Sequence, residues 1–115
     1  MKKIYYLETC DSCRKIMKQF NFSDFEKQEI KTQPVSAAQL DELKEITGSY
    51  AALFSKRAKK YKEMGLINED LSETEIRYYI LNEYTFLKRP VIVDGNKIFI
   101  GSDKKNLEKL TAYFT

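Results

Sequence analysis

The sequence contains no histidine and no tryptophan, and only two of its 115 residues are cysteine. Without histidine there is no Cys–His catalytic dyad, no imidazole acid–base catalyst and no histidine-ligated metal. Two cysteines without histidine make a poor metal site, so we expect no bound metal and no bound organic cofactor. If a cysteine is activated, a helix N-terminus and nearby cations must lower its pKa.

Long apolar runs are also missing. No stretch approaches the ~20 apolar residues of a membrane span, and the apolar run near the N-terminus is too short for a secretory signal. We therefore expect a cytoplasmic protein without membrane association, in which a cysteine pair is more often catalytic or redox-sensing than structural. The net charge is only +3, from 20 basic and 17 acidic residues, which does not indicate direct nucleic-acid binding.

Both cysteines lie in one short motif near the N-terminus. The apolar run Ile4–Leu7 predicts a buried strand, and the apolar residues from Cys13 to Phe20 recur at helical spacing. Cys10 falls in the turn between these elements and Cys13 in the first helical turn, a strand-to-helix placement typical of thioredoxin-like redox motifs. Unpaired N–H groups and the helix dipole at this point favour a thiolate over a thiol.

The sequence between residues 36 and 88 predicts three helices. The first lies between Ser36 and Gly48, the second between Ser49 and Gly65, and the third runs from the capping box Ser72-Glu-Thr-Glu75 to a stop at Leu87-Lys-Arg-Pro90. Four aromatic residues at helical spacing are assigned to the core of this region: Tyr78, Tyr79, Tyr84 and Phe86.

The remaining elements predict a sheet. A weak edge strand over residues 25–30 is expected to pair in parallel with the first strand through a right-handed crossover. Strands 91–93 and 97–100 form a hairpin about Asp94-Gly95-Asn96, and a last helix follows. This order predicts an α/β protein with a thioredoxin-like fold, in which a four-stranded mixed sheet carries helices on both faces. We expect one domain, residues 1–115, with 1–35 and 88–115 as the thioredoxin-like core and 36–87 as an inserted helical subdomain.

Three stretches carry a family resemblance. They are Thr9-Cys-Asp-Ser-Cys-Arg14, then Leu53-Phe-Ser-Lys-Arg57 with Tyr61-Lys-Glu-Met-Gly-Leu66, and finally Leu87-Lys-Arg-Pro-Val-Ile-Val93. In these motifs, their order and their spacing, the chain resembles the arsenate reductase family that works with glutathione and glutaredoxin. That family also includes the Spx-type transcription regulators.

The resemblance implies roles for individual residues. Cys10 matches the nucleophile that attacks arsenate, and Arg89 and Arg57 match arginines that bind the substrate oxyanion. Arg14, the last residue of the cysteine motif, is a further candidate for substrate binding. Pro90 matches the cis-proline beside the site in thioredoxin-like folds. These residue types suit the chemistry, because arginine forks bind tetrahedral oxyanions bidentately and a cation such as Arg89 lowers a thiol pKa.

Two functions of different classes follow from the resemblance. The first is a thiol-dependent reductase with glutathione as co-substrate, in which glutathione, glutaredoxin or Cys13 resolves the adduct on Cys10. The second is a Spx-like redox-switched regulator that binds RNA polymerase and uses a Cys10–Cys13 disulfide as its switch. A general thiol–disulfide reductase lies between the two.

Structural roles remain open for the same residues. Cys13 is also consistent with a small buried thiol, since cysteine is often buried as a hydrophobe. Arg89 follows a predicted helix and is suited to stabilising its C-terminal dipole. Arg57 belongs to the basic run Lys56-Arg-Ala-Lys-Lys60, which is equally typical of a solvated helix face.

Overall fold

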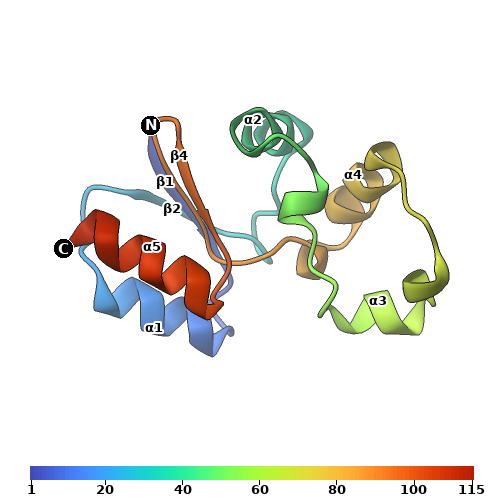
Figure 1. Ribbon diagram of the computed structural model, residues 1–115, viewed down its shortest axis with the longest axis horizontal. Helices are drawn as coiled ribbons and strands as arrows, with labels where there is room; N and C mark the ends of the chain where they lie inside the picture. Colours follow the sequence, from blue (N-terminus) through green and yellow to red (C-terminus); the bar gives the residue numbers. More distant parts are fainter. The chain divides into compact units, whose positions relative to one another are not determined.

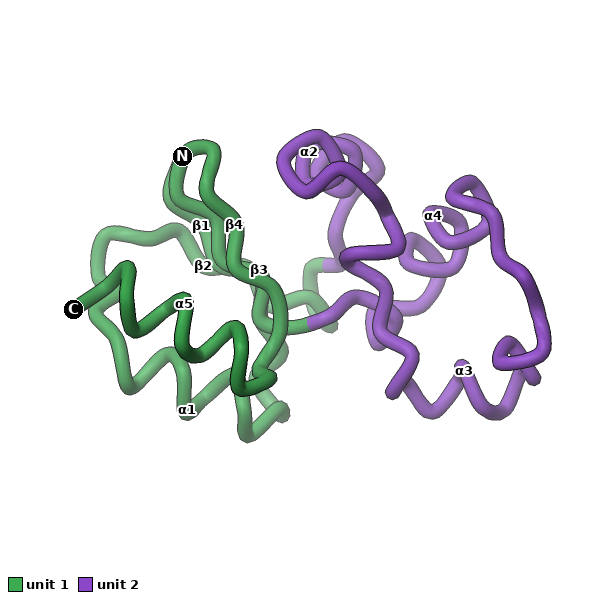
Figure 2. Tube along the Cα trace, viewed as in Figure 1, with its two compact units in different colours: residues 1–33, 89–115 green, residues 34–88 purple.

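The computed structural model describes all residues from 1 to 115 (Figure 1) and divides the chain into two compact units (Figure 2). Unit 1 consists of residues 1–33 and 89–115, and unit 2 of residues 34–88. Neither unit contains a helix that is long and apolar enough to cross a membrane.

Unit 1 is built on a four-stranded mixed sheet with the strand order β2-β1-β3-β4. The strands are β1 (Lys2–Tyr6), β2 (Glu26–Glu29), β3 (Val91–Asp94) and β4 (Lys97–Ile100). β1 and β2 are parallel, whereas β3 is antiparallel to both β1 and β4. The predicted α/β class, the mixed sheet and the edge position of the weak second strand are confirmed.

Helices α1 (Asp11–Gln19) and α5 (Lys104–Phe114) pack on the same face of this sheet, as Figure 1 shows. The register explains this, because Ile4 pairs with Ile92 and Ile92 with Phe99, which places three apolar side chains in one row across three strands. Ile16 of α1 and Leu110 of α5 pack against that row. The two helices of unit 1 therefore cover one face of its sheet.

Unit 2 contains α2 (Ala37–Thr47), α3 (Lys59–Glu63) and α4 (Glu73–Asn82), with three short 3₁₀ turns, η1 (Ala51–Leu53), η2 (Leu66–Asn68) and η3 (Tyr84–Phe86). Ser36 and Ser72 each form a complete capping box, as the sequence predicted for Ser72. Gly48 ends α2 with φ +96°, a conformation that glycine adopts without steric cost.

The single helix predicted between Ser49 and Gly65 is wrong. The 3₁₀ turn η1 ends at Leu53, Phe54 is extended and forms a β-bridge with Leu87, and α3 begins only at Lys59. Two backbone hydrogen bonds fix this segment, from the N–H of Ser55 to the carbonyl of Phe86 at 2.7 Å and from Lys88 to Leu53 at 2.8 Å. Pairing between distant segments has replaced local helical hydrogen bonding.

The end of α4 also differs from the prediction. The helix ends at Asn82, and η3 occupies part of the stretch that the sequence assigned to helix before Leu87. Phe86 is fully buried, as expected of a core residue, but Tyr78 is 62% exposed. The assignment of Tyr78 to the core of the helical region is therefore wrong, because helical spacing alone did not identify the buried face.

A polar cluster links α2 to α4 within unit 2. Arg77 donates from Nε to Oδ1 of Asp41 at 2.8 Å and from Nη2 to Oδ2 at 3.1 Å, and the Tyr50 hydroxyl donates to the same carboxylate. The hydrogen bonds from Arg77 and then from Tyr50 lower the pKa of Asp41 from 3.8 to about 2. The cluster therefore requires the charged form of Asp41.

Candidate active site

Cys10 occupies the N-cap position of α1, where the chain leaves β1 and turns into the helix. Its backbone is extended, with φ −88° and ψ 114°, and its N–H donates to the carbonyl of Leu7 at 3.0 Å. Its carbonyl accepts the N–H of Arg14 at 3.1 Å. The half-buried thiol of Cys10 lies beside N–H groups of the first helical turn that have no acceptor within the helix.

Cys13 lies one turn further along α1 and has no exposed surface. Both cysteines are free thiols. Burial is the main reason why the pKa of Cys13 rises from 9.0 to about 12. The backbone N–H of Leu7 lowers this pKa, and the negative charge that Cys10 carries as a thiolate raises it further. Cys13 is therefore a protonated thiol at neutral pH.

The pKa of Cys10 moves in the opposite direction. Partial burial raises it, but hydrogen bonds from the backbone N–H and the thiol of Cys13 outweigh burial, with further help from the charge of Arg89 and the N–H of Ser12. The net result is a pKa below the ordinary 9.0. Two cysteines in opposite environments give one nucleophile and one proton-bearing partner.

Arg89 and Pro90 precede β3 in the same unit as the cysteines. Arg89 is half-buried, and its charge lowers the pKa of both Cys10 and Cys13. The Arg89–Pro90 peptide bond is cis, as the family resemblance implied. Pro90 is buried, and its carbonyl accepts the N–H of Gly101 at 2.9 Å, which extends the pairing of β3 with β4.

The other two arginines singled out in the sequence have different surroundings. Arg14 is exposed and forms an ion pair with Asp11 in the first turn of α1. Arg57 belongs to unit 2, where it lies exposed between η1 and α3. The structure thus brings together Cys10, Cys13 and the Arg89–Pro90 pair in unit 1.

The sequence predicted backbone donors at the helix start, but it did not identify the contribution of Leu7. The N–H groups of Ser12 and Cys13 act on Cys10, and that of Leu7 acts on Cys13. The signal for the first two was the helix start itself, whereas Leu7 is recognised only once the turn after β1 is seen. No group of three or more His, Cys, Asp or Glu side chains is placed to hold a metal ion.

Comparisons with known proteins identify relatives of the whole chain. The sequence profile of the ArsC family matches residues 5–110. The global transcriptional regulator Spx of Lactiplantibacillus plantarum is 25% identical over 109 residues, covering 92% of this chain and 83% of that protein.

Solved structures share the fold. A putative ArsC-family-related protein from Bacteroides fragilis matches with a TM-score of 0.78 at 20% identity, over 95% of this chain and 96% of that one. An arsenate reductase from Vibrio cholerae matches with a TM-score of 0.75 at 20% identity, over 93% and 95% respectively. At 20% identity, these matches show a shared thioredoxin-like fold and do not by themselves show a shared activity.

Proposed function

This chain belongs to the ArsC family, and from that premise we propose that it is a thiol-dependent reductase of arsenate. The observation that carries the proposal is the contrast between the two cysteines. Cys10 has a lowered pKa at a helix N-terminus, and the buried Cys13 keeps its proton. A half-buried thiolate that receives hydrogen bonds and lies near a cation suits attack on an anionic substrate.

In the first step the Cys10 thiolate attacks the arsenic atom of arsenate. A sulfur–arsenic bond forms, one arsenic–oxygen bond breaks, and the departing hydroxyl group takes a proton from solvent and leaves as water. Arg89 holds the remaining oxyanion atoms, and Arg57 supplies a second guanidinium. Arginine suits this task because its planar fork makes two parallel hydrogen bonds to such groups.

In the second step a thiolate attacks the sulfur of Cys10. The electron pair of the sulfur–arsenic bond stays on arsenic, which falls from the +5 to the +3 state and leaves as arsenite, while two thiols become one disulfide. Glutathione supplies this thiolate as co-substrate, and glutaredoxin then reduces the mixed disulfide. Cys13 is the alternative, once it has lost its proton. Because its pKa is raised, a smaller fraction of Cys13 than of a free thiol is ionised at neutral pH.

The test is arsenite formation from arsenate with glutathione and glutaredoxin present. We expect turnover by the wild type, none by Cys10→Ser, and retained turnover by Cys13→Ala, in which the external thiol still resolves the adduct. Cys13→Ser is the matched control, since it keeps a hydrogen-bond donor beside Cys10. A wild type without turnover, whose Cys10 still alkylates as a low-pKa thiol, would contradict the reductase proposal.

A second candidate function is favoured by a specific observation. The thiol of Cys13 donates a hydrogen bond to the sulfur of Cys10, so the two sulfurs are neighbours, and the Spx protein of L. plantarum is a relative over most of the chain. On this proposal an oxidant such as diamide takes up two hydrogens from the thiols, a Cys10–Cys13 disulfide forms, and binding to RNA polymerase changes.

Binding of the oxidised and the reduced chain to purified RNA polymerase separates the two functions. A regulator shows a difference between the two redox states that Cys13→Ala abolishes. A reductase binds equally weakly in both states.

A further inference from the structure

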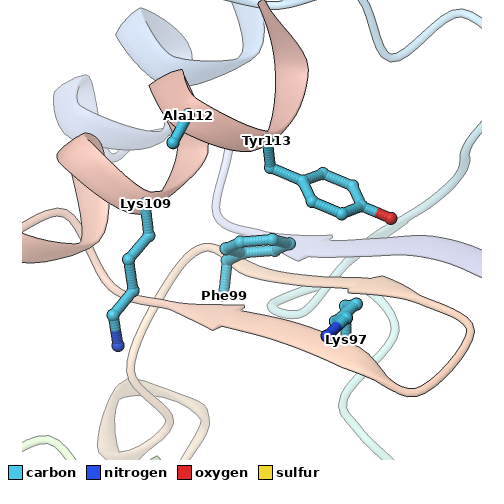
Figure 3. Close-up of a pocket in the computed structure, with 5 residues that line it drawn as sticks. All are labelled: Lys97, Phe99, Lys109, Ala112 and Tyr113. Atoms are coloured by element: carbon cyan, nitrogen blue, oxygen red, sulfur yellow. The ribbon is translucent and has the colours of Figure 1, made fainter.

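A groove unrelated to the cysteine site lies on unit 1 between β4 and the C-terminal half of α5 (Figure 3). Its volume is about 350 Å³, and five residues line it: Lys97, Phe99, Lys109, Ala112 and Tyr113. We propose that this groove, together with the free edge of β4, binds an extended acidic peptide segment that carries a large apolar side chain as its anchor.

The floor of the groove is aromatic and held in place. The ring of Phe99 is only 7% exposed, and it lies 5.1 Å from the ring of Tyr113, measured between centroids. Tyr113 is 44% exposed, although its hydroxyl donates to Oδ2 of Asp94 at 3.0 Å. Because that hydrogen bond fixes the ring, the exposed aromatic surface is a preformed wall for an apolar side chain.

The rim of the groove is positively charged. Lys97 on β4 and Lys109 on α5 line it, no acidic residue does, and neither lysine forms an ion pair in the structure. Lys105, one turn before Lys109, extends the same side of α5 and is exposed. An apolar floor between unpaired cations is complementary to an apolar side chain flanked by carboxylates.

The neighbouring backbone is able to pair with another strand. β4 is the last strand of the sheet, and the hydrogen bond from Gly101 N–H to the Pro90 carbonyl identifies residues 90 and 101 as a bonded pair. Bonded and non-bonded pairs alternate along an antiparallel ladder, so Phe99 is bonded to β3 while Ile98 and Ile100 are not. The N–H and C=O groups of Ile98 and Ile100 therefore point away from the sheet.

These features select one class of occupant. A chain that extends the sheet along β4 gains main-chain hydrogen bonds from Ile98 and Ile100. Every second side chain of the bound segment then points to the face of the sheet that carries Lys97 and Phe99. On that face one apolar side chain enters the groove, and acidic side chains two positions before and after it contact the lysines. This proposal is independent of the chemistry proposed for Cys10.

A blocked peptide of the sequence Glu-Thr-Phe-Thr-Glu is a suitable probe, because strand alternation places both glutamates on the same side as the phenylalanine. The matched control peptide, Thr-Glu-Phe-Glu-Thr, has the same composition but carries its carboxylates on the opposite side. Titration of the full-length chain is followed by amide chemical shifts. We expect the first peptide to perturb residues 97–100 and 109–113 and to bind at least about tenfold more tightly than the control.

Two further measurements complete the test. The double variant Lys97→Glu with Lys109→Glu is expected to weaken binding about tenfold or more, whereas Lys18→Glu with Lys31→Glu, the same charge change on exposed lysines outside the groove, leaves it unchanged. Saturating peptide is expected to slow hydrogen exchange of the Ile98 and Ile100 amides but not that of Phe99.

The proposal would be overturned if the two peptides bound equally tightly, or if the perturbed amide chemical shifts mapped to residues outside the groove. It would also be overturned if the peptide did not slow hydrogen exchange of the Ile98 and Ile100 amides. So would a free protein that sediments as a dimer with those two amides already protected, because a second copy of the chain would then be the occupant of this edge.

Discussion

At the scale of single residues, the two cysteines show how position separates two identical side chains. Cys10 precedes the helix and receives hydrogen bonds, so its thiolate is favoured. Cys13 is enclosed by the core, so its thiol is favoured and its pKa rises to about 12. The spacing in the sequence indicated the helix start and the activation of Cys10, but the full burial of Cys13 depends on the packing of α1 against the sheet.

The charge of Arg89 gives a testable consequence at this scale. Replacing Arg89 by methionine removes a cation that favours the Cys10 thiolate, so the pKa of Cys10 rises. Alkylation by iodoacetamide, which consumes the thiolate, is expected to slow at neutral pH, and its midpoint to move to higher pH. Arg14→Met is the matched control because Arg14 is paired with Asp11. An equal shift in both variants would contradict a specific role for Arg89.

At the scale of elements, features that depend on local hydrogen bonds were predicted from the sequence, whereas features that depend on pairing between distant segments were not. The capping box at Ser72 and the terminal Gly48 were readable from the sequence because their hydrogen bonds and dihedral angles are local. The break at Phe54 was not, since it depends on a bridge to Leu87, more than thirty positions away. The edge position of β2 followed from its low apolar content, whereas the packing of α1 and α5 on one face required the register of the strands.

The link between α2 and α4 makes stability depend on pH. Asp41 has a folded pKa of about 2 against an ordinary 3.8, so its contribution is fully present above about pH 3.8 and is lost as the pH falls towards 2. We expect Asp41→Asn to lower the free energy of unfolding at pH 6, and the deficit relative to the wild type to shrink between pH 4 and pH 2. Urea unfolding of both proteins between pH 2 and pH 6 measures this difference in the free energy of unfolding.

The control for this prediction is Glu42→Gln, which removes a carboxylate from an exposed position of α2 that makes no ion pair or side-chain hydrogen bond. A deficit for Asp41→Asn that stays constant with pH would mean that the shape of the side chain, and not its charge, holds the two helices together.

At the scale of the whole molecule, the two units contribute different chemistry to the proposed reaction. The groups that set the pKa of Cys10 are Ser12, Cys13 and Arg89, and all three belong to unit 1. Unit 2 carries the exposed basic run from Lys56 to Lys62 that contains Arg57. Activation of the nucleophile is thus contained in the unit with the sheet, and the second oxyanion-binding cation is assigned to the other unit by the family motif alone.

This division predicts that nucleophile activation and substrate binding can be separated by mutation. Arg57→Met is expected to raise the KM for arsenate by about tenfold, because a charge-assisted, bidentate contact is lost. The same variant is expected to leave the pH midpoint of Cys10 alkylation unchanged, since Arg57 is not among the main groups that set that pKa. Lys62→Met removes a charge from the same basic run and is expected to change neither quantity. An unchanged KM would remove Arg57 from the proposed site, whereas a shifted alkylation midpoint in Arg57→Met would contradict the separation of nucleophile activation from substrate binding.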